Sequence, residues 1–217
     1  MKHTITAIVG GFFHDESTIR ASLEQALEQQ GLQASVSIHY TTYDRLSECL
    51  DDAPDAVILF KEDRLNPGSP EVHRWMTPET AGRIADYVRQ GGSWLGWHSG
   101  LASFEKAAEY IAMLRGHFIM HPREHSEVTY TVQKNELGIH EGRTFAFMDE
   151  HYFVECDEAN TNVFLRSSSK DGESIAGWHH FFGVGKVCCL TPAHTIEGLN
   201  SPDTAAILGR VLQWIVS

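Results

Sequence analysis

The chain has 217 residues, 42% of them hydrophobic, and a formal net charge of −12 at pH 7. This length and composition suit one α/β domain over residues 1–217, and the negative charge argues against nucleic acid or an anionic membrane as a partner. No segment has the pattern of a secretory leader or the apolar length of a membrane span. The four cysteines lack zinc-finger spacing, and buried, reduced thiols at 188–189 indicate a cytoplasmic location.

The first half of the chain alternates between expected strands and helices. Short apolar runs predict strands at residues 4–9, 34–39, 56–60 and 92–95. A helix after the first strand carries Ile19, Leu23 and Leu27 on one face, and a second helix begins at 77–79, where Thr-Pro-Glu combines a cap, a proline and an acid. A further helical pattern covers 101–114. This alternation predicts a doubly wound, mostly parallel sheet of the flavodoxin-like type.

The second half of the chain is richer in strands. Strands are expected at residues 127–132, 163–166, 174–178 and 186–190. A last helix begins at 201–203, and its apolar residues from Ile207 to Ile215 repeat at helical spacing. The predicted fold class is therefore α/β, with a doubly wound, mostly parallel sheet and a strand-rich C-terminal half. Edge strands of such sheets often pair with a second copy, so a homodimer is the expected assembly.

The most informative segment is 96–100, Gly-Trp-His-Ser-Gly, which follows an expected strand and precedes a helical pattern. A strand, a tight turn bounded by glycines and a helix form a nucleophile elbow, which holds one side chain above the carboxyl edge of a parallel sheet. That side chain is His98. Imidazole is a poor permanent nucleophile for hydrolysis but a good metal ligand or general base. The structural alternative is a buried histidine that is hydrogen-bonded to the backbone.

Polar residues follow the other expected strands and the helical pattern after the elbow. They are His14, Asp15, Lys61, Glu62, Asp63, His117, His121, Asp149, Glu150, His151, Tyr152 and His194. Ligands bind outside the carboxyl ends of the strands in open α/β sheets. We therefore expect several of these histidines and one carboxylate to share a single mouth.

The preferred metal ligands are His98, His121, Glu150 and His194. Neutral imidazoles together with a carboxylate suit zinc, manganese, iron or nickel, so a divalent metal is the expected cofactor. Each residue has a structural alternative, because loop histidines also bond to backbone and a glutamate also caps helices or lies in solvent. The other histidines are expected in structural roles at His179 and His180, and in solvent at His3, His39, His73, His125 and His140.

The candidate catalytic residues are His98, Glu150 and Tyr152. Glu150 would act as a ligand or general base, and Tyr152 as a proton donor or substrate contact. The candidate substrate-binding residues are His14, Trp97, Ser99, His117 and His151. Trp97 could stack on a sugar ring, although core packing is the commoner role of aromatic side chains.

Over nearly its whole length the chain resembles the ThuA-like family, the trehalose-utilisation proteins. The resemblance rests on the order of the segments 10–15, 91–99, 116–118, 121–122, 149–152, 177–178, 183–186 and 193–195. It implies the fold of class I glutamine amidotransferases and a role in carbohydrate metabolism, beside sugar oxidoreductases that make keto-sugars. The amidotransferase cysteine is absent from the elbow, so glutaminase activity is not implied. His151 stands where many relatives carry an apolar residue, which makes it a candidate to replace or add a ligand.

The sequence therefore predicts a cytoplasmic, metal-dependent enzyme that acts on a sugar or keto-sugar, as an isomerase, epimerase or hydrolase. A different class of function is the alternative: a non-catalytic sugar-binding or regulatory protein that kept the fold without the cysteine nucleophile. A third reading gives His98 a catalytic role without a metal. All three place His98 at the carboxyl edge of the sheet.

Overall fold

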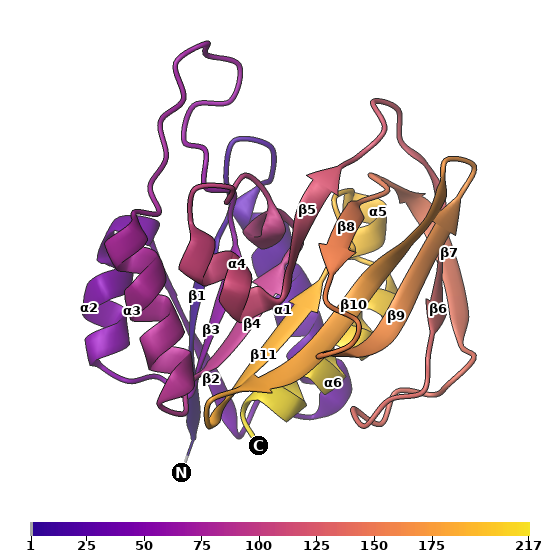
Figure 1. Cartoon of the computed structure of the whole chain (residues 1–217). Helices are drawn as coiled ribbons and strands as arrows, with labels where there is room; N and C mark the ends of the chain where they lie inside the picture. The colour runs from indigo at the N-terminus through magenta and orange to yellow at the C-terminus, as the bar shows by residue number, and fades with distance from the viewer. Residues whose placement is uncertain (1) are drawn as a thin grey trace.

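The computed structural model describes residues 2–217, and a nine-stranded sheet runs through the whole molecule (Figure 1). In spatial order its strands are β2 (Val36–Thr41), β1 (His3–Val9), β3 (Ala56–Phe60), β4 (Ser93–Trp97), β11 (Gly185–Leu190), β10 (Gly172–Phe182), β9 (Asn162–Ser169), β6 (Ser126–Val132) and β7 (Thr144–Asp149). A separate two-stranded sheet pairs β5 (Gly116–Met120) with β8 (Phe153–Cys156). Both sheets contribute loops to the same edge of the molecule.

The large sheet is parallel in one half and antiparallel in the other. From β2 to β11 every neighbouring pair is parallel, and from β11 to β7 every pair is antiparallel. The expected mostly parallel sheet is thus correct only for the first half. Tight turns join β9 to β10 and β10 to β11, and such connections can link only antiparallel strands, whereas the parallel strands are linked through helices.

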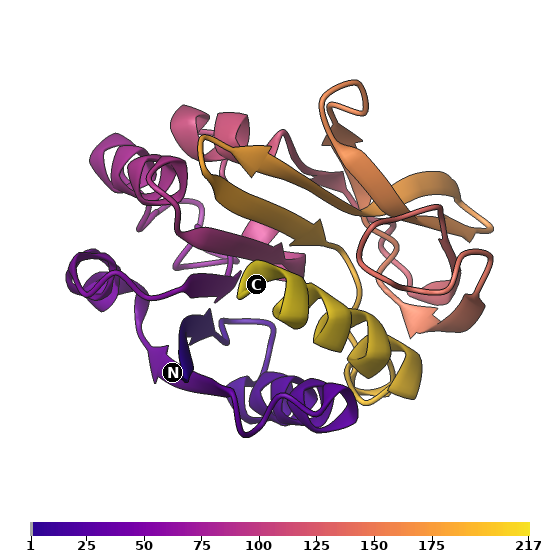
Figure 2. The same cartoon turned by 90° about the horizontal axis from the view of Figure 1, so that it is seen from below.

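Helices cover both faces of the parallel half (Figure 2). One face is covered by α1 (Glu16–Gln30), α5 (Ile196–Leu199) and α6 (Pro202–Ile215), and the other by α2 (Leu46–Asp51), α3 (Pro78–Arg89) and α4 (Ala108–Leu114). Consequently the apolar run of β3 is buried on both sides, as a central parallel strand requires. Among residues 2–217 no helix has the length and apolar character needed to cross a membrane.

The helix caps follow the sequence closely. The Asp15 carboxylate accepts the Thr18 N–H at the start of α1, and Gly31 ends this helix in the left-handed conformation, with φ of 69°. Thr77 caps α3 and Ser201 caps α6, each directly before a proline at the first helical position. These capping interactions set where each helix begins or ends. They thereby help to position the ends of the strands that the helices connect.

The segment after the elbow differs from the expected helix over 101–114. A short 3₁₀ turn, η2 (His98–Leu101), is followed by an irregular stretch, and α4 begins only at Ala108. Ser103 has a φ of 71°, which no right-handed helix accepts, and its carbonyl is bonded by the Arg74 guanidinium. The tertiary contact to Arg74 therefore outweighs the local helical preference.

The elbow is a strained turn held against the neighbouring strand. His98 has a φ of 46°, in the left-handed region that non-glycine residues rarely occupy. Gly100 lies directly against the Leu59 carbonyl of β3, so a Cβ at position 100 would overlap this oxygen. The glycine is needed for this close approach, and the approach holds His98 at the carboxyl edge of the sheet.

We predict that Gly100→Ala destabilises the protein by about 3 kcal/mol or more, because neither the Leu59 carbonyl nor the turn can move without disturbing the sheet. Gly82→Ala is the matched control, since a Cβ at this position on α3 meets no atom within 4 Å. It should stabilise the helix by up to about 1 kcal/mol. Urea unfolding of both variants tests this, and equal stabilities would contradict the role given to Gly100.

Candidate functional site

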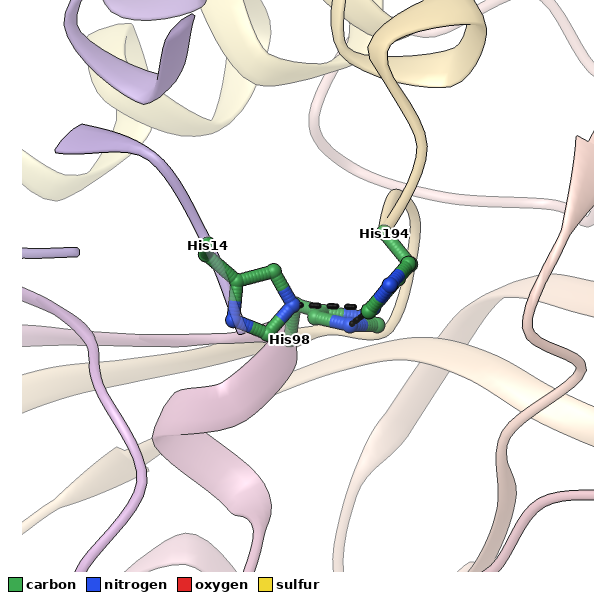
Figure 3. A group of neighbouring side chains, drawn as sticks. All are labelled: His14, His98 and His194. Atoms are coloured by element: carbon green, nitrogen blue, oxygen red, sulfur yellow. Dashed lines mark hydrogen bonds between the residues drawn. The ribbon is translucent and has the colours of Figure 1, made fainter. Parts of the chain in front are cut away.

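Three histidines from three separate loops meet at the carboxyl edge of the parallel strands (Figure 3). His14 follows β1, His98 follows β4 and His194 follows β11. His194 Nδ1 lies 2.9 Å from His14 Nε2 and 3.4 Å from His98 Nε2. Their ring nitrogens therefore converge on one point, although β1 and β11 are separated by two strands in the sheet.

His98 is fixed in one tautomer and one orientation. Its Nδ1 lies 2.7 Å from the Thr191 carbonyl, which can only accept, so Nδ1 is the donor and the Nε2 lone pair faces the other two histidines. The ring stacks on Tyr152, with centroids 4.1 Å apart, and is completely buried. Burial, aided by the neighbouring His14 and His194, lowers the pKa of His98 well below its ordinary value. The imidazole is thus neutral and ready to act as a ligand.

His194 is positioned through the backbone by Asp149. One oxygen of this buried carboxyl group accepts the N–H groups of His194, at 2.8 Å, and Thr195, at 3.2 Å. The other oxygen accepts the Tyr130 hydroxyl at 3.0 Å. Burial raises the pKa of Asp149 to about 6, although these hydrogen bonds oppose the rise. Asp149 therefore holds the loop that presents His194, and the sequence patterns alone did not identify this role.

Glu150 lies at the centre of the polar residues. One of its oxygens, Oε2, lies 3.1 Å from His194 Nδ1 and 3.9 Å from His98 Nε2. Its Oε1 lies 3.6 Å from His121 Nε2 and 3.8 Å from His125 Nε2. Burial would raise the pKa of Glu150, but the hydrogen bond and charge of His194, with the charges of His121 and His125, outweigh it and lower the pKa. Glu150 is thus an anionic carboxylate surrounded by four imidazoles.

These distances fit a single divalent ion. Two ligand atoms bound tetrahedrally at 2.0–2.1 Å from one ion lie about 3.4 Å apart. The four separations given above run from 2.9 to 3.9 Å, and three of them share His194 Nδ1. Burial, with the nearby His194, also lowers the pKa of His14 to about 4, so this ring is neutral as well. The donor set of three imidazoles and one carboxylate suits zinc, manganese, iron or nickel.

Several expected site residues converge and others take different places. His98, His194 and Glu150 meet as expected, while His14, expected as a substrate contact, supplies the fourth donor. His121 reaches the outer oxygen of Glu150 instead. His125, expected in solvent, lies beside the same oxygen. The signal for His125 was its place in the loop that also carries His121, between β5 and β6.

Three expected substrate contacts lie elsewhere. Trp97 is fully buried because β4 is covered on both faces. Its indole N–H donates to the Pro192 carbonyl. His117, on β5, lies 4.0 Å from Glu155 and does not line the cavity described below. The His151 ring bonds to the hydroxyls of two serines on β9, at 2.8 and 3.0 Å. It points away from the site because successive side chains of an extended segment alternate in direction.

A cavity of about 450 Å³ opens beside the cluster, and His14, His194 and Glu150 line it. Its wall includes Glu62, Ser99 and Tyr152, and residues 64, 67 and 68 of the long segment between β3 and α3 also line it. This volume lies within the range of small-molecule sites. A larger hollow of about 690 Å³ beside the ends of β1 to β3 shares Phe13 and His14 with it but is lined by neither His194 nor Glu150. The chemistry therefore lies in the smaller cavity.

Comparisons with known proteins agree with this architecture. The model of the ThuA family, described as trehalose utilisation, matches residues 5–215. No curated protein matches the chain by sequence. A ThuA-like protein from Parabacteroides merdae superposes with a TM-score of 0.74 at 15% identity, over 100% of this chain and 91% of that one.

Two further solved structures share the fold. A cytoplasmic protein from Salmonella typhimurium LT2 gives a TM-score of 0.65 at 15% identity, over 99% of each chain. A β-galactosidase from Bacillus circulans gives 0.61 at 12% identity, over 99% of this chain but 30% of that enzyme. At these identities the likeness concerns the fold alone.

The lowered pKa of His14 predicts that the folded protein loses stability as the pH falls. Because its folded pKa, about 4, lies below the ordinary value of 6.5, the folded metal-free protein binds fewer protons than the unfolded chain between these pH values. The stability from neutral His14 is complete above pH 6.5 and is lost as the pH falls toward 4, by about 3 kcal/mol. Asp149, with its raised pKa, acts in the opposite direction.

Urea unfolding with a chelator, from pH 7 to pH 4, should show this loss in the wild type and a shallower loss in His14→Gln. The contribution of Asp149 cancels in the difference between the two proteins. His140→Gln, at an exposed position, is the control and should follow the wild type. A His14→Gln profile parallel to that of the wild type would remove His14 from the explanation.

Proposed function

Because the chain belongs to the ThuA family of trehalose-utilisation proteins, we propose that it is a metal-dependent enzyme acting on a sugar or keto-sugar. The observation that carries the proposal is that His194 Nδ1 lies within 3.4 Å of His14, His98 and Glu150 beside a cavity. Four donors from four segments, two of them buried and two half-buried, are a costly arrangement for a merely structural cluster. A bound divalent ion supplies the positive charge that these lone pairs lack.

The ion would be held by the three imidazoles and Glu150, and it would supply a Lewis acid toward a sugar carbonyl or hydroxyl. Other residues of the protein hold these ligands in place and contact the substrate. Asp149 and the Thr191 carbonyl hold His194 and His98 in place. Burial, with the charges of Glu150 and Asp149, raises the pKa of Tyr152 well above its ordinary value. Tyr152 therefore keeps its proton at neutral pH and would donate a hydrogen bond to an oxygen of the substrate.

The reaction belongs to one of three types: isomerisation, epimerisation or hydrolysis. Each would use a substrate oxygen polarised by the ion and a hydrogen-bond donor such as Tyr152 beside it. The carbohydrate class rests on the family and on the fold shared with part of a β-galactosidase. The cytoplasmic location and the homodimer remain predictions, the first in keeping with the description of the Salmonella neighbour.

The alternative is a non-catalytic sugar-binding or regulatory protein. One observation favours it: the elbow carries His98 where a hydrolytic nucleophile of this fold would stand. In this alternative the cavity binds a sugar and releases it unchanged. A catalytic His98 acting without a metal is the third reading, and it also needs the fixed tautomer of His98.

Metal content separates these readings. Protein purified without chelator or affinity tag should contain about one equivalent of a divalent metal, measured by inductively coupled plasma mass spectrometry. His98→Ala and His194→Ala should each weaken metal binding by at least about 100-fold, because each removes one of four ligands. With a chelator present, which removes the stabilisation that a bound metal gives the wild type, their melting temperatures should stay close to that of the wild type.

The control is His117→Ala, which removes an imidazole outside the cavity and should keep full metal content. A metal-free wild type that binds a sugar tightly without turning it over would support the regulatory alternative. Unfolding of His98→Ala would mean that His98 is structural.

A further inference from the structure

Four residues that line the cavity each carry a buried polar atom with no hydrogen-bond partner within residues 2–217. The atoms are Glu62 Oε2, Ser99 Oγ, His14 Nδ1 and Arg64 Nε. The exposed fractions of Glu62, Ser99 and His14 are 5%, 2% and 8%. A buried polar atom without a partner costs about 1–3 kcal/mol, so native proteins contain few of them. Four such atoms around one cavity indicate a ligand whose polar groups complete them.

Glu62 is held so that one of its oxygens stays free. Its Oε1 accepts the Phe12 N–H at 3.0 Å, and its backbone carbonyl accepts the Trp75 indole N–H at 3.0 Å. These contacts tie the end of β3 to two loops and leave Oε2 as the unused acceptor. Gly11 lies against the same carboxyl group, where a Cβ would overlap Oε2. The glycine thus preserves the position of Glu62.

We infer that Glu62 and Ser99 bind hydroxyl groups of the sugar. A carboxylate oxygen only accepts, so Glu62 Oε2 requires a donor such as a sugar hydroxyl. The Ser99 hydroxyl both donates and accepts, and suits another hydroxyl of the same sugar. Neither residue belongs to the histidine cluster, so this pair recognises the sugar while the cluster holds the ion.

Glu62 and Glu150 differ in their contacts and therefore in their proposed roles. Glu150 already faces four histidines through its two oxygens. Glu62 has no such partners and keeps an oxygen for the substrate. The inference rests on the proposed function, because it assigns the part of the same cavity that binds the hydroxyl groups of the substrate.

Isothermal titration of metal-loaded protein with D-fructose and with trehalose tests the inference. Glu62→Gln keeps the size of the side chain and the acceptor for Phe12, and should weaken binding of whichever sugar the wild type binds by about 10-fold or more. Ser99→Ala should weaken it by about 5- to 10-fold. Both variants should keep the metal content and melting temperature of the wild type.

Gly11→Ala is an independent variant, since its new methyl group displaces the Glu62 carboxyl group without removing any donor atom. Gly11→Ala should weaken sugar binding by as much as Glu62→Gln does. The control is Glu155→Gln, an exposed glutamate outside the cavity, which should bind sugar like the wild type.

The outcomes distinguish the two levels of proposal. If the wild type contains no metal or binds neither sugar, the proposed function fails and the inference fails with it. If the wild type binds metal and sugar, and Glu62→Gln and Ser99→Ala bind the sugar equally well, the inference alone is overturned. Weaker sugar binding at unchanged metal content supports it.

Discussion

The parallel pairing of β4 with β11 is the constraint on which the site depends. Trp97 lies opposite Leu190, the last residue of β11, so the two chains leave the sheet side by side. His98 and Thr191 are the next residues, and their hydrogen bond is a direct result of this register. A slip of one residue would turn His98 to the other face and break this bond. The orientation of the central imidazole is thus set by strand pairing, before any ligand is considered.

Burial and nearby charges have opposite effects on the ionisation of the residues in the cluster. Apolar surroundings favour neutral imidazoles, and the pKa values of His14 and His98 fall accordingly. Glu150 remains anionic beside them because nearby histidines favour its charged form. The result is a concentration of lone pairs and one negative charge in a site that Phe60 and Tyr152 shield from solvent. Such a site has a strong electrostatic preference for a cation.

Sequence patterns predicted the elements that local chemistry decides. The elbow at His98, the caps of α1, α3 and α6 and the buried strand β3 all follow from a few neighbouring residues. The short strands β5, β7 and β8 were not predicted; β5 and β8 pair with each other across the intervening β6 and β7, whereas β7 pairs with β6, the strand directly before it. The same distinction holds in the site. His98 was identifiable from its own turn, whereas the closeness of His125 to Glu150 depends on how the β5–β6 loop folds over the sheet.

The four donors are separated by long stretches of chain, from His14 near one end to His194 near the other. During synthesis, β1 and its loop emerge long before β11, and β4 must wait for β11 as its parallel neighbour. Contacts between such distant segments form late and slow the folding of a domain. A nascent chain can therefore hold its first helices and strands while the cluster is still open. The cluster is therefore complete only after β11 has paired with β4. A shorter nascent chain has no pocket that contains the same four side chains.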